Sequence, residues 1–195
     1  MYEFLSYRQV VTEDAELLMH WRSKPDVSRY MATEFEANLE HQKVWLHARG
    51  ADEHYHHRII QIHGNDVGYC SITVTDPRSR IGELGVYIGD ETAPRELTIY
   101  NFLGTHNHAF FSLGLHKIVN HIMTDNARTL QLQKFNGYRE VGVLKEHWRR
   151  SERWCDVHIF EMTAQRWYDF RTKFDYNKDW DGQHTMPSSL GSEER

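Results

Sequence analysis

The chain has 195 residues, of which 39% are hydrophobic and 13% aromatic, a composition typical of a folded domain and not of a disordered protein. Its formal net charge of -5 argues against a general nucleic-acid binder, because such proteins carry a basic surface. No apolar run reaches the ~18 residues of a membrane span, and the first segment, MYEFLSYRQV, lacks a signal-peptide pattern, so we expect a cytoplasmic protein with no membrane or nucleic-acid partner.

The first half of the chain predicts a strand, two helices and three further strands. Apolar residues at helical spacing follow Thr12, a typical N-cap residue, and Pro25 follows their end. Two later apolar runs flank turn residues, which indicates a hairpin. The expected elements are a strand over 4–11, helices over 13–23 and 37–49, a hairpin around 63–66 and a strand over 81–89, with a loop over 90–96.

The second half predicts a long helix, then a strand, a helix and two closing strands. Apolar side chains recur at helical spacing along the long helix, and His106 lies on that stripe. We therefore expect His106 to be a hydrogen-bonded core residue. The expected elements are helices over 97–113 and 127–135, a strand over 116–123, strands within 141–150 and 153–162, and a further helical pattern over 164–174.

These elements predict an α/β fold in which a central mixed sheet of about seven strands is flanked by about four helices. Residues 1–175 form one domain, and the polar segment 176–195 is predicted to be a disordered tail. A strand–loop–helix unit lies near the middle of the sheet. Open α/β sheets bind phosphorylated ligands at such a point.

The cysteines and histidines form no recognisable metal site. Cys70 and Cys155 lie in separate apolar strand-like runs, as buried thiols of a reducing compartment do. The 14 histidines cluster at 54–58 and 106–108, but none has the partner spacing of a structural zinc site. We therefore expect no metal.

The block LGLHKIVNHIMTDNARTLQLQKFNGYREVGVLKEHWR and the strands VGYCSIT and ELGVYIG resemble the GNAT superfamily of N-acetyltransferases. The resemblance implies the GNAT fold and acetyl-CoA as co-substrate. The segments 18–26 and 30–31, with His41 and Trp45, are similar to the sugar-nucleotide branch of that superfamily. That branch implies a small-molecule sugar-nucleotide partner and acetylation of the 4-amino group of UDP-4-amino-4,6-dideoxy-N-acetyl-β-L-altrosamine, a step of pseudaminic acid synthesis.

The resemblance also implies where acetyl-CoA lies. The backbone of Val86, Tyr87 and Ile88, at the end of the fourth strand, would hold the thioester. Asn126 and Arg128 would lie beside the rest of the cofactor, at the start of the helix that walls the thiol.

The expected pyrophosphate loop departs from the family pattern. Relatives carry a Gln/Arg-x-x-Gly-x-Gly/Ala loop, whose amides approach phosphate closely, whereas 93–98 reads Ala-Pro-Arg-Glu-Leu-Thr. The helix N-terminal amides at Leu97 and Thr98 and a charge-assisted bond from Arg95 still offer phosphate contacts, opposed by Glu96. Weaker or differently posed CoA binding is the expectation.

A second departure is Gln133, which stands where many relatives carry a tyrosine that protonates the leaving thiolate. An amide cannot act as an acid at neutral pH, but it can donate a hydrogen bond to sulfur. Because a thiol of pKa ~8.5 leaves tolerably as the thiolate, we expect a slower enzyme and not an inactive one. Tyr138, after Gly137, is expected to be a packing aromatic.

The acceptor amine needs a base, because a group of pKa ~10 is almost fully protonated at neutral pH. Glu83, two residues before Gly85, stands where many relatives carry one, and Ser71 matches a serine near the acceptor nitrogen in the sugar-nucleotide branch. Both also fit ordinary strand positions. His121 is a third candidate, although its alternation with Asn120 leaves open which side chain faces the cleft.

The resemblance assigns the nucleotide to Arg22, Met31 and His41. Arg22 would neutralise the diphosphate, and His41 would hydrogen-bond it or a sugar hydroxyl. Tyr30 and Met31 offer an apolar face to uracil, although core packing explains them equally well.

Two other functions stay open at this point: a ribosomal-protein-type N-terminal acetyltransferase of the same superfamily, and a non-catalytic module that binds acyl-CoA or a nucleotide. The sequence does not fix the stereochemistry of the acceptor, and it leaves open whether the chain forms a homodimer.

Overall fold

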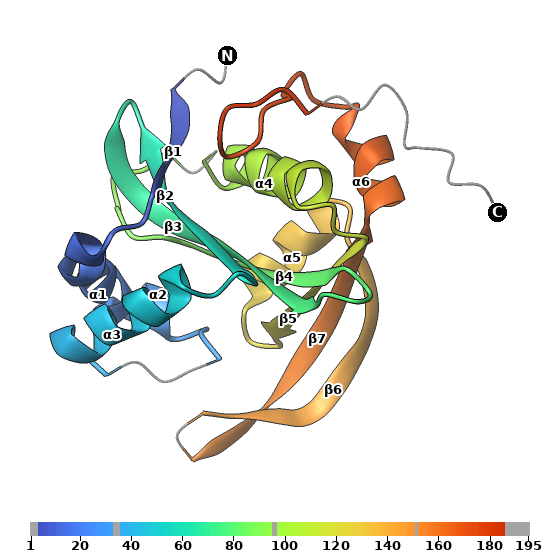
Figure 1. Cartoon of the computed structure of the whole chain (residues 1–195). Helices are drawn as coiled ribbons and strands as arrows, with labels where there is room; N and C mark the ends of the chain where they lie inside the picture. Colours follow the sequence, from blue (N-terminus) through green and yellow to red (C-terminus); the bar gives the residue numbers. More distant parts are fainter. Residues whose placement is uncertain (1–3, 33–35, 95–96, 151, 186–195) are drawn as a thin grey trace.

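The computed structural model describes residues 4–32, 36–94, 97–150 and 152–185. Seven strands form one mixed sheet in the order β1-β2-β3-β4-β5-β7-β6, and six helices cover it (Figure 1). The strands are β1 (Leu5–Gln9), β2 (Tyr55–Ile62), β3 (Asn65–Asp76), β4 (Ile81–Ile88), β5 (Lys117–Met123), β6 (Arg139–Arg150) and β7 (Arg153–Thr163). The helices are α1 (Ala15–Ser23), α2 (Pro25–Ser28), α3 (Leu39–Gly50), α4 (Leu97–Asn107), α5 (Ala127–Phe135) and α6 (Ala164–Arg171).

The mixed α/β sheet predicted from the sequence is confirmed, with differences at helix ends. A short turn of 3-10 helix over Thr12–Asp14 precedes α1. Its N-cap residue is Val11 and not Thr12, and the Asp14 carboxylate accepts the backbone N–H of Val11 at 2.9 Å. The helix expected over 97–113 divides into α4 and a π-helical turn over His108–Ser112. No helix among the described residues is long and apolar enough to cross a membrane.

The two halves of the sheet meet at a short parallel contact between β4 and β5. Only two residue pairs join these strands, Ile81 with Lys117 and Gly82 with Ile118. On its other side, β4 pairs with β3 along its whole length, from Ile81 to Ile88. The sheet is therefore continuous at one end of β4 and divided at the other.

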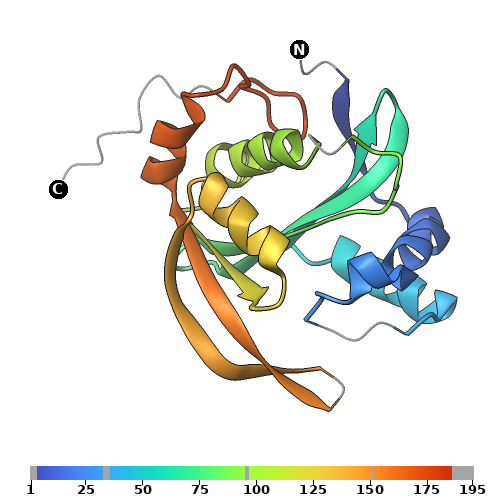
Figure 2. The ribbon, with the colours of Figure 1, turned by 180° about the vertical axis from the view of Figure 1, so that it is seen from behind.

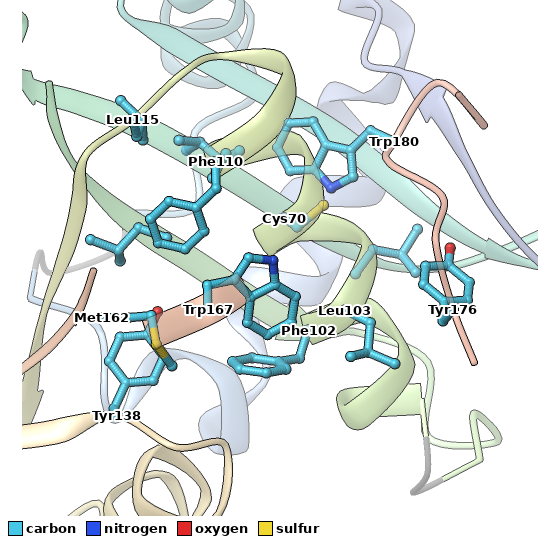
Figure 3. Close-up of a cluster of buried hydrophobic side chains, with 14 of the residues drawn as sticks. Cys70, Phe102, Leu103, Phe110, Leu115, Tyr138, Met162, Trp167, Tyr176 and Trp180 are labelled. Atoms are coloured by element: carbon cyan, nitrogen blue, oxygen red, sulfur yellow. The ribbon is translucent and has the colours of Figure 1, made fainter. Parts of the chain in front are cut away.

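Helices cover both faces of the sheet. α1, α2 and α3 lie on one face, and α4 and α5 lie side by side on the other (Figures 1 and 2). The α4 face holds the main core, which Figure 3 shows around Trp167, Phe102 and Phe110. A smaller core on the α1 face joins Leu18 and Leu46 to strand residues of β2 and β3.

The β6–β7 hairpin extends well beyond the other strands (Figure 1). Near its tip, a guanidinium N–H of Arg150 donates to the backbone oxygen of Ser28 at the end of α2, at 3.4 Å. The hairpin and the α1–α2 region therefore border the same side of the sheet.

The segment 176–185 differs from the disordered tail predicted for 176–195. Trp180 is only 2% exposed, and its indole N–H donates to Thr105 Oγ1 at 3.0 Å. The Asn107 side chain donates to the backbone oxygen of Lys178 at 2.9 Å. The segment thus closes the core over α4, because its aromatic residues outweigh its polar composition; 186–195 lie outside the described residues.

Candidate active site

The site lies where β4 and β5 separate. The Asn120 side-chain oxygen accepts a hydrogen bond from the backbone N–H of Leu84 at 3.0 Å, just past the last paired residues. Leu84 therefore points its backbone N–H toward β5, and by the alternation of a strand Val86 and Ile88 do the same. Val86 is 49% exposed. This edge of β4 presents backbone donors and acceptors where β5 has moved away.

Two ionisable side chains meet across this separation. His121 of β5 places Nδ1 3.0 Å from Oε1 of Glu83 on β4. The hydrogen bond to Glu83 raises the pKa of His121 above its usual value, against the opposing effect of burial. Because a carboxylate only accepts, Nδ1 carries the proton and Nε2 of the neutral ring keeps a lone pair. The pair has the arrangement of an oriented histidine base.

Ser71 lies on the same face as this pair. It is opposite Gly85 in the β3–β4 register, and Glu83 is opposite Thr73, so all these residues share one side of the sheet. A Cβ atom added at Gly85 would lie 2.7 Å from Ser71 Oγ. The glycine therefore leaves room over β4 for the buried Ser71 hydroxyl.

A bulge in β6 brings two aromatic residues to His121. Leu144 pairs with Val157 but Trp148 pairs with Cys155, so β6 holds two more residues than β7 between these pairs. The ring centroids of His147 and Trp148 each lie 6.4 Å from that of His121. Bulges redirect side chains in this way beside functional sites.

Asp156 holds the bulge in shape. Its Oδ1 accepts the backbone N–H of Glu146 at 2.9 Å, and its Oδ2 accepts Lys145 Nζ at 2.8 Å. Glu146 has a φ of 49°, which is uncommon for a residue with a side chain. The bonds from Asp156 compensate for this backbone strain.

Aromatic residues line the α1–α3 side of the same face. Tyr87 of β4 stacks on Tyr69 with ring centroids 5.2 Å apart, and Trp21 meets Tyr87 edge-on at 6.4 Å. The guanidinium of Arg22 lies 6.0 Å over the Trp45 ring. Arg22 thus brings a positive charge into an aromatic surface near the place where β4 and β5 separate.

On the other face of the sheet, α5 carries a side-chain amide near each end, Asn126 and Gln133. Asn126 is its N-cap, and the side-chain oxygen accepts the backbone N–H of Thr129 at 3.2 Å. Gln133, near the end of the helix, has a buried Oε1 with no hydrogen-bond partner among the described residues. A buried carbonyl without a donor costs free energy, so a ligand that donates to Gln133 would be favoured there.

Comparisons with known proteins show the family of the chain. Residues 5–139 match the family model described as an acetyltransferase (GNAT) domain. The chain belongs to the GNAT acetyltransferase family. It is therefore an acetyl-CoA-dependent N-acetyltransferase, which decides for an enzyme over the non-catalytic binding module.

Individual relatives of this acetyltransferase are distant. An uncharacterized N-acetyltransferase p20 of Bacillus licheniformis is 21% identical over 170 residues, which are 85% of this chain and 96% of the relative. Among solved structures, the spermidine N-acetyltransferase of Vibrio cholerae in complex with CoA and spermine has a TM-score of 0.74 at 19% identity and covers 85% of this chain and 98% of its own. A structure described as a probable acetyltransferase has a TM-score of 0.72 at 17% identity. The match covers 85% of this chain and 96% of that one. At these identities the solved structures show the shared fold.

The cofactor residues proposed for the acetyltransferase have different surroundings. Val86 and Ile88 lie on the free edge of β4, whereas the Tyr87 side chain belongs to the α1–α3 face. The Leu97 side chain is buried in the main core, and its N–H donates to the Pro94 oxygen at 3.0 Å. That amide is consequently not available to phosphate.

The other residues that the sequence assigned to acetyl-CoA or to the nucleotide lie away from the place where β4 and β5 separate, or make no described contact with it. Arg128 is exposed on α5, and Tyr30 and Met31 are half-buried after α2. His41 is exposed in the first turn of α3, and no contact joins its side chain to the cleft within the described part of the chain. Arg95 and the side chain of Thr98 lie outside the described residues.

Away from the cleft, His108, Asp179 and Asp181 bring three potential metal-ligand atoms within 4.8 Å of one another. The Asp179 carboxylate already accepts from Ser112 Oγ at 2.5 Å and from two backbone amides. Arg58 also pairs with Asp181 at 3.1 Å. These bonds account for the cluster as part of the C-terminal packing.

Proposed function

We propose that the acetyltransferase acetylates a primary amine on a nucleotide-linked amino sugar, of the UDP-4-amino-4,6-dideoxy-N-acetyl-β-L-altrosamine type, with His121 as the general base. The observation that carries the proposal is the Glu83–His121 bond on the face opposite α4 and α5. Histidine is suited to this work because its pKa lies near neutrality.

Proton transfer from the acceptor comes first. The Glu83 carboxylate fixes the proton on Nδ1 of His121, so that Nε2 takes a proton from the acceptor ammonium and Glu83 stabilises the resulting imidazolium. The hydroxyl of Ser71 accepts or donates a hydrogen bond at the acceptor nitrogen. The neutral amine then attacks the thioester carbon.

The thioester carbonyl lies against the free edge of β4. A backbone N–H of Val86 or Ile88 donates to the oxygen as it gains negative charge in the tetrahedral intermediate. The nitrogen of the intermediate loses its second proton to solvent, the carbon–sulfur bond breaks, and the amide forms as the CoA thiolate leaves. The amide of Gln133 donates to the sulfur, and solvent supplies the proton that an acidic side chain would otherwise give.

The charges bordering the cleft favour an anionic acceptor. Arg22 on α1, Arg29 after α2 and Arg150 on β6 lie on the elements that border this face. Arg29 also stacks on the Tyr30 ring at 4.7 Å, so that Tyr30 and Met31 can offer a flat apolar contact to a base. A diphosphate is attracted to such a rim, whereas a polyamine is repelled by it.

The test is CoA thiol release from acetyl-CoA with three acceptors: the UDP-linked 4-amino-4,6-dideoxy sugar, spermidine, and a ribosomal-protein N-terminal peptide. We expect thiol release with the sugar nucleotide and not with spermidine or the peptide. In Arg22→Met the KM for the sugar nucleotide should rise without a change in the KM for acetyl-CoA. Arg49→Met is the matched control, because Arg49 stacks on Tyr55 toward the far end of α3. This variant should leave the KM for the sugar nucleotide and the KM for acetyl-CoA unchanged. Release with spermidine or peptide only would refute the sugar-nucleotide acceptor.

A further inference from the structure

A chain of four polar contacts runs from the division of the sheet into α4. It starts at the backbone N–H of Leu84, which donates to Asn120 Oδ1 at 3.0 Å. The Asn120 amide also interacts with the hydroxyl of Tyr138 and lowers its pKa, against the larger rise that burial causes. That hydroxyl lies 2.6 Å from Nε2 of His106, whose Nδ1 lies 2.7 Å from the backbone oxygen of Phe102. All three side chains are buried.

The ends of this chain fix the direction of every bond in it. The N–H of Leu84 can only donate, and the carbonyl of Phe102 can only accept. His106 therefore carries its proton on Nδ1, and Nε2 accepts from the Tyr138 hydroxyl. Tyr138 in turn accepts from the Asn120 amide. Burial lowers the pKa of His106 to about 3, so the ring is neutral and this single arrangement holds at physiological pH.

The chain also replaces a missing part of the sheet. Backbone pairing between β4 and β5 ends at Gly82 and Ile118, and the part-buried backbone N–H of Leu84 finds no acceptor on the β5 backbone. The Asn120 side chain supplies that acceptor. The contact of the Asn120 amide with Tyr138 restricts how far this side chain can follow a shift of the two strands.

We propose that Asn120 is a positioning residue for acetyl transfer, and that Tyr138 and His106 hold it so that the two separated strands keep the catalytic distance. Glu83 precedes Leu84 in β4, and His121 follows Asn120 in β5. One bond between Leu84 and Asn120 consequently sets both the Glu83–His121 contact and the direction of the Val86 backbone. The inference rests on the proposed role of His121 as the base.

Loss of this bond should therefore affect turnover more than substrate binding. In Asn120→Leu the N–H of Leu84 loses its acceptor and the strands are free to shift. A misplacement of about 1 Å costs roughly 10²-fold in rate, so kcat should fall by about that factor, with a smaller change in the KM for acetyl-CoA. The pKa of His121, followed by NMR, should fall toward its usual ~6.5 as its bond to Glu83 weakens.

Two further variants separate the steps of the chain. Asn120→Asp keeps an acceptor for Leu84 but no longer donates to Tyr138, and Tyr138→Phe removes the hydroxyl from the middle of the chain. Both should fold and lose less activity than Asn120→Leu. Thr105→Val is the matched control, since Thr105 is a buried hydrogen-bonding residue of α4 that contacts Trp180 instead. It should lower the melting temperature and leave kcat and the His121 pKa unchanged.

A purely structural role for Asn120 would lower the melting temperature of Asn120→Leu and Asn120→Asp while kcat and the His121 titration matched the wild type. That result would overturn the proposal. The base role of His121 is decided separately by His121→Gln. If His121→Gln keeps the wild-type rate, the proposed function loses its base, while the His121 titration in the Asn120 variants still tests the positioning role.

Discussion

The Nδ1 atom of His121 lies 3.0 Å from Oε1 of Glu83, although the strands that carry these residues no longer pair there. A side-chain hydrogen bond thus bridges the two halves of the sheet on the face opposite α4. In the proposed function, the role of this pair depends on the separation of the two strands being held constant.

The first prediction concerns the pH dependence of activity. Glu83 raises the pKa of His121. The imidazolium of the wild type therefore loses its proton at a pH above the ~6.5 at which an ordinary histidine titrates. A base must be unprotonated, so Glu83→Gln should move the acid limb of kcat/KM to lower pH. Glu140→Gln is the control, because Glu140 makes the same kind of bond to His158 at 2.5 Å. An acid limb that stays in place in Glu83→Gln would exclude His121 as the titrating base.

The second prediction concerns Gly85 and Ser71. A methyl group at Gly85 would lie 2.7 Å from Ser71 Oγ, which is too close for a van der Waals contact, so Gly85→Ala should displace the hydroxyl. A lost hydrogen bond costs about 0.5–1.5 kcal/mol, and kcat/KM for the acceptor should fall by roughly 3- to 10-fold. In a double-mutant cycle, Gly85→Ala should add little to Ser71→Ala. Fully additive losses would show that Gly85→Ala acts independently of Ser71, and an unchanged kcat/KM in Ser71→Ala would show that Ser71 does not contact the acceptor.

The third prediction concerns the leaving group. Gln133→Tyr introduces a group that can protonate the thiolate, and kcat should rise by less than the ~10²-fold at the lower end of general acid catalysis, because the thiolate already leaves tolerably. Gln133→Phe has nearly the same size without the acid, and it should show no rise. Equal rates in the two variants would place Gln133 away from the sulfur.

The fourth prediction concerns stability. Trp180 is 2% exposed, so Trp180→Ala should lower the free energy of unfolding by about 3–5 kcal/mol, the range for buried aromatic residues. Trp154, 56% exposed, provides the matched control, and Trp154→Ala should change stability by less than ~0.5 kcal/mol. Urea denaturation measures both. If the two variants are equally stable, the segment 176–185 does not close the core in solution.

Local pattern explains most of the fold that was predicted from the sequence. The helix expected over 127–135 agrees with α5 at both ends, because Asn126 caps it and Gly137 follows with a φ of 82°, where glycine is favoured. His106 and Tyr138 are the buried residues that their apolar neighbours predicted. The disorder predicted for 176–185 is wrong, because average polarity hides single aromatic residues such as Trp180 that fill gaps in a core.

The site was only partly predictable. The family resemblance implies Glu83 and Ser71 as candidates, and the pKa of a histidine makes His121 a third. The β3–β4 register explains why Glu83 and Ser71 share a face, and the bond to Glu83 shows that His121 reaches the same face. Nothing in the local sequence around His147 and Trp148 signals their approach to His121, because it results from a bulge held by Asp156. The contact of Asn120 with Leu84 likewise depends on strands distant in sequence.

The arrangement of the helices has a kinetic consequence. α4 and α5 lie on one face of the sheet, and Glu83, Ser71 and His121 lie on the other. With acetyl-CoA beside α5 and the acceptor beside Glu83, as proposed, the two substrates would approach the free edge of β4 from opposite directions. Neither needs to leave before the other arrives. Cys70 and Cys155, the nucleophiles that could store an acyl group, are both buried. Double-reciprocal plots at several fixed acetyl-CoA concentrations should accordingly intersect, as they do when both substrates occupy the enzyme together.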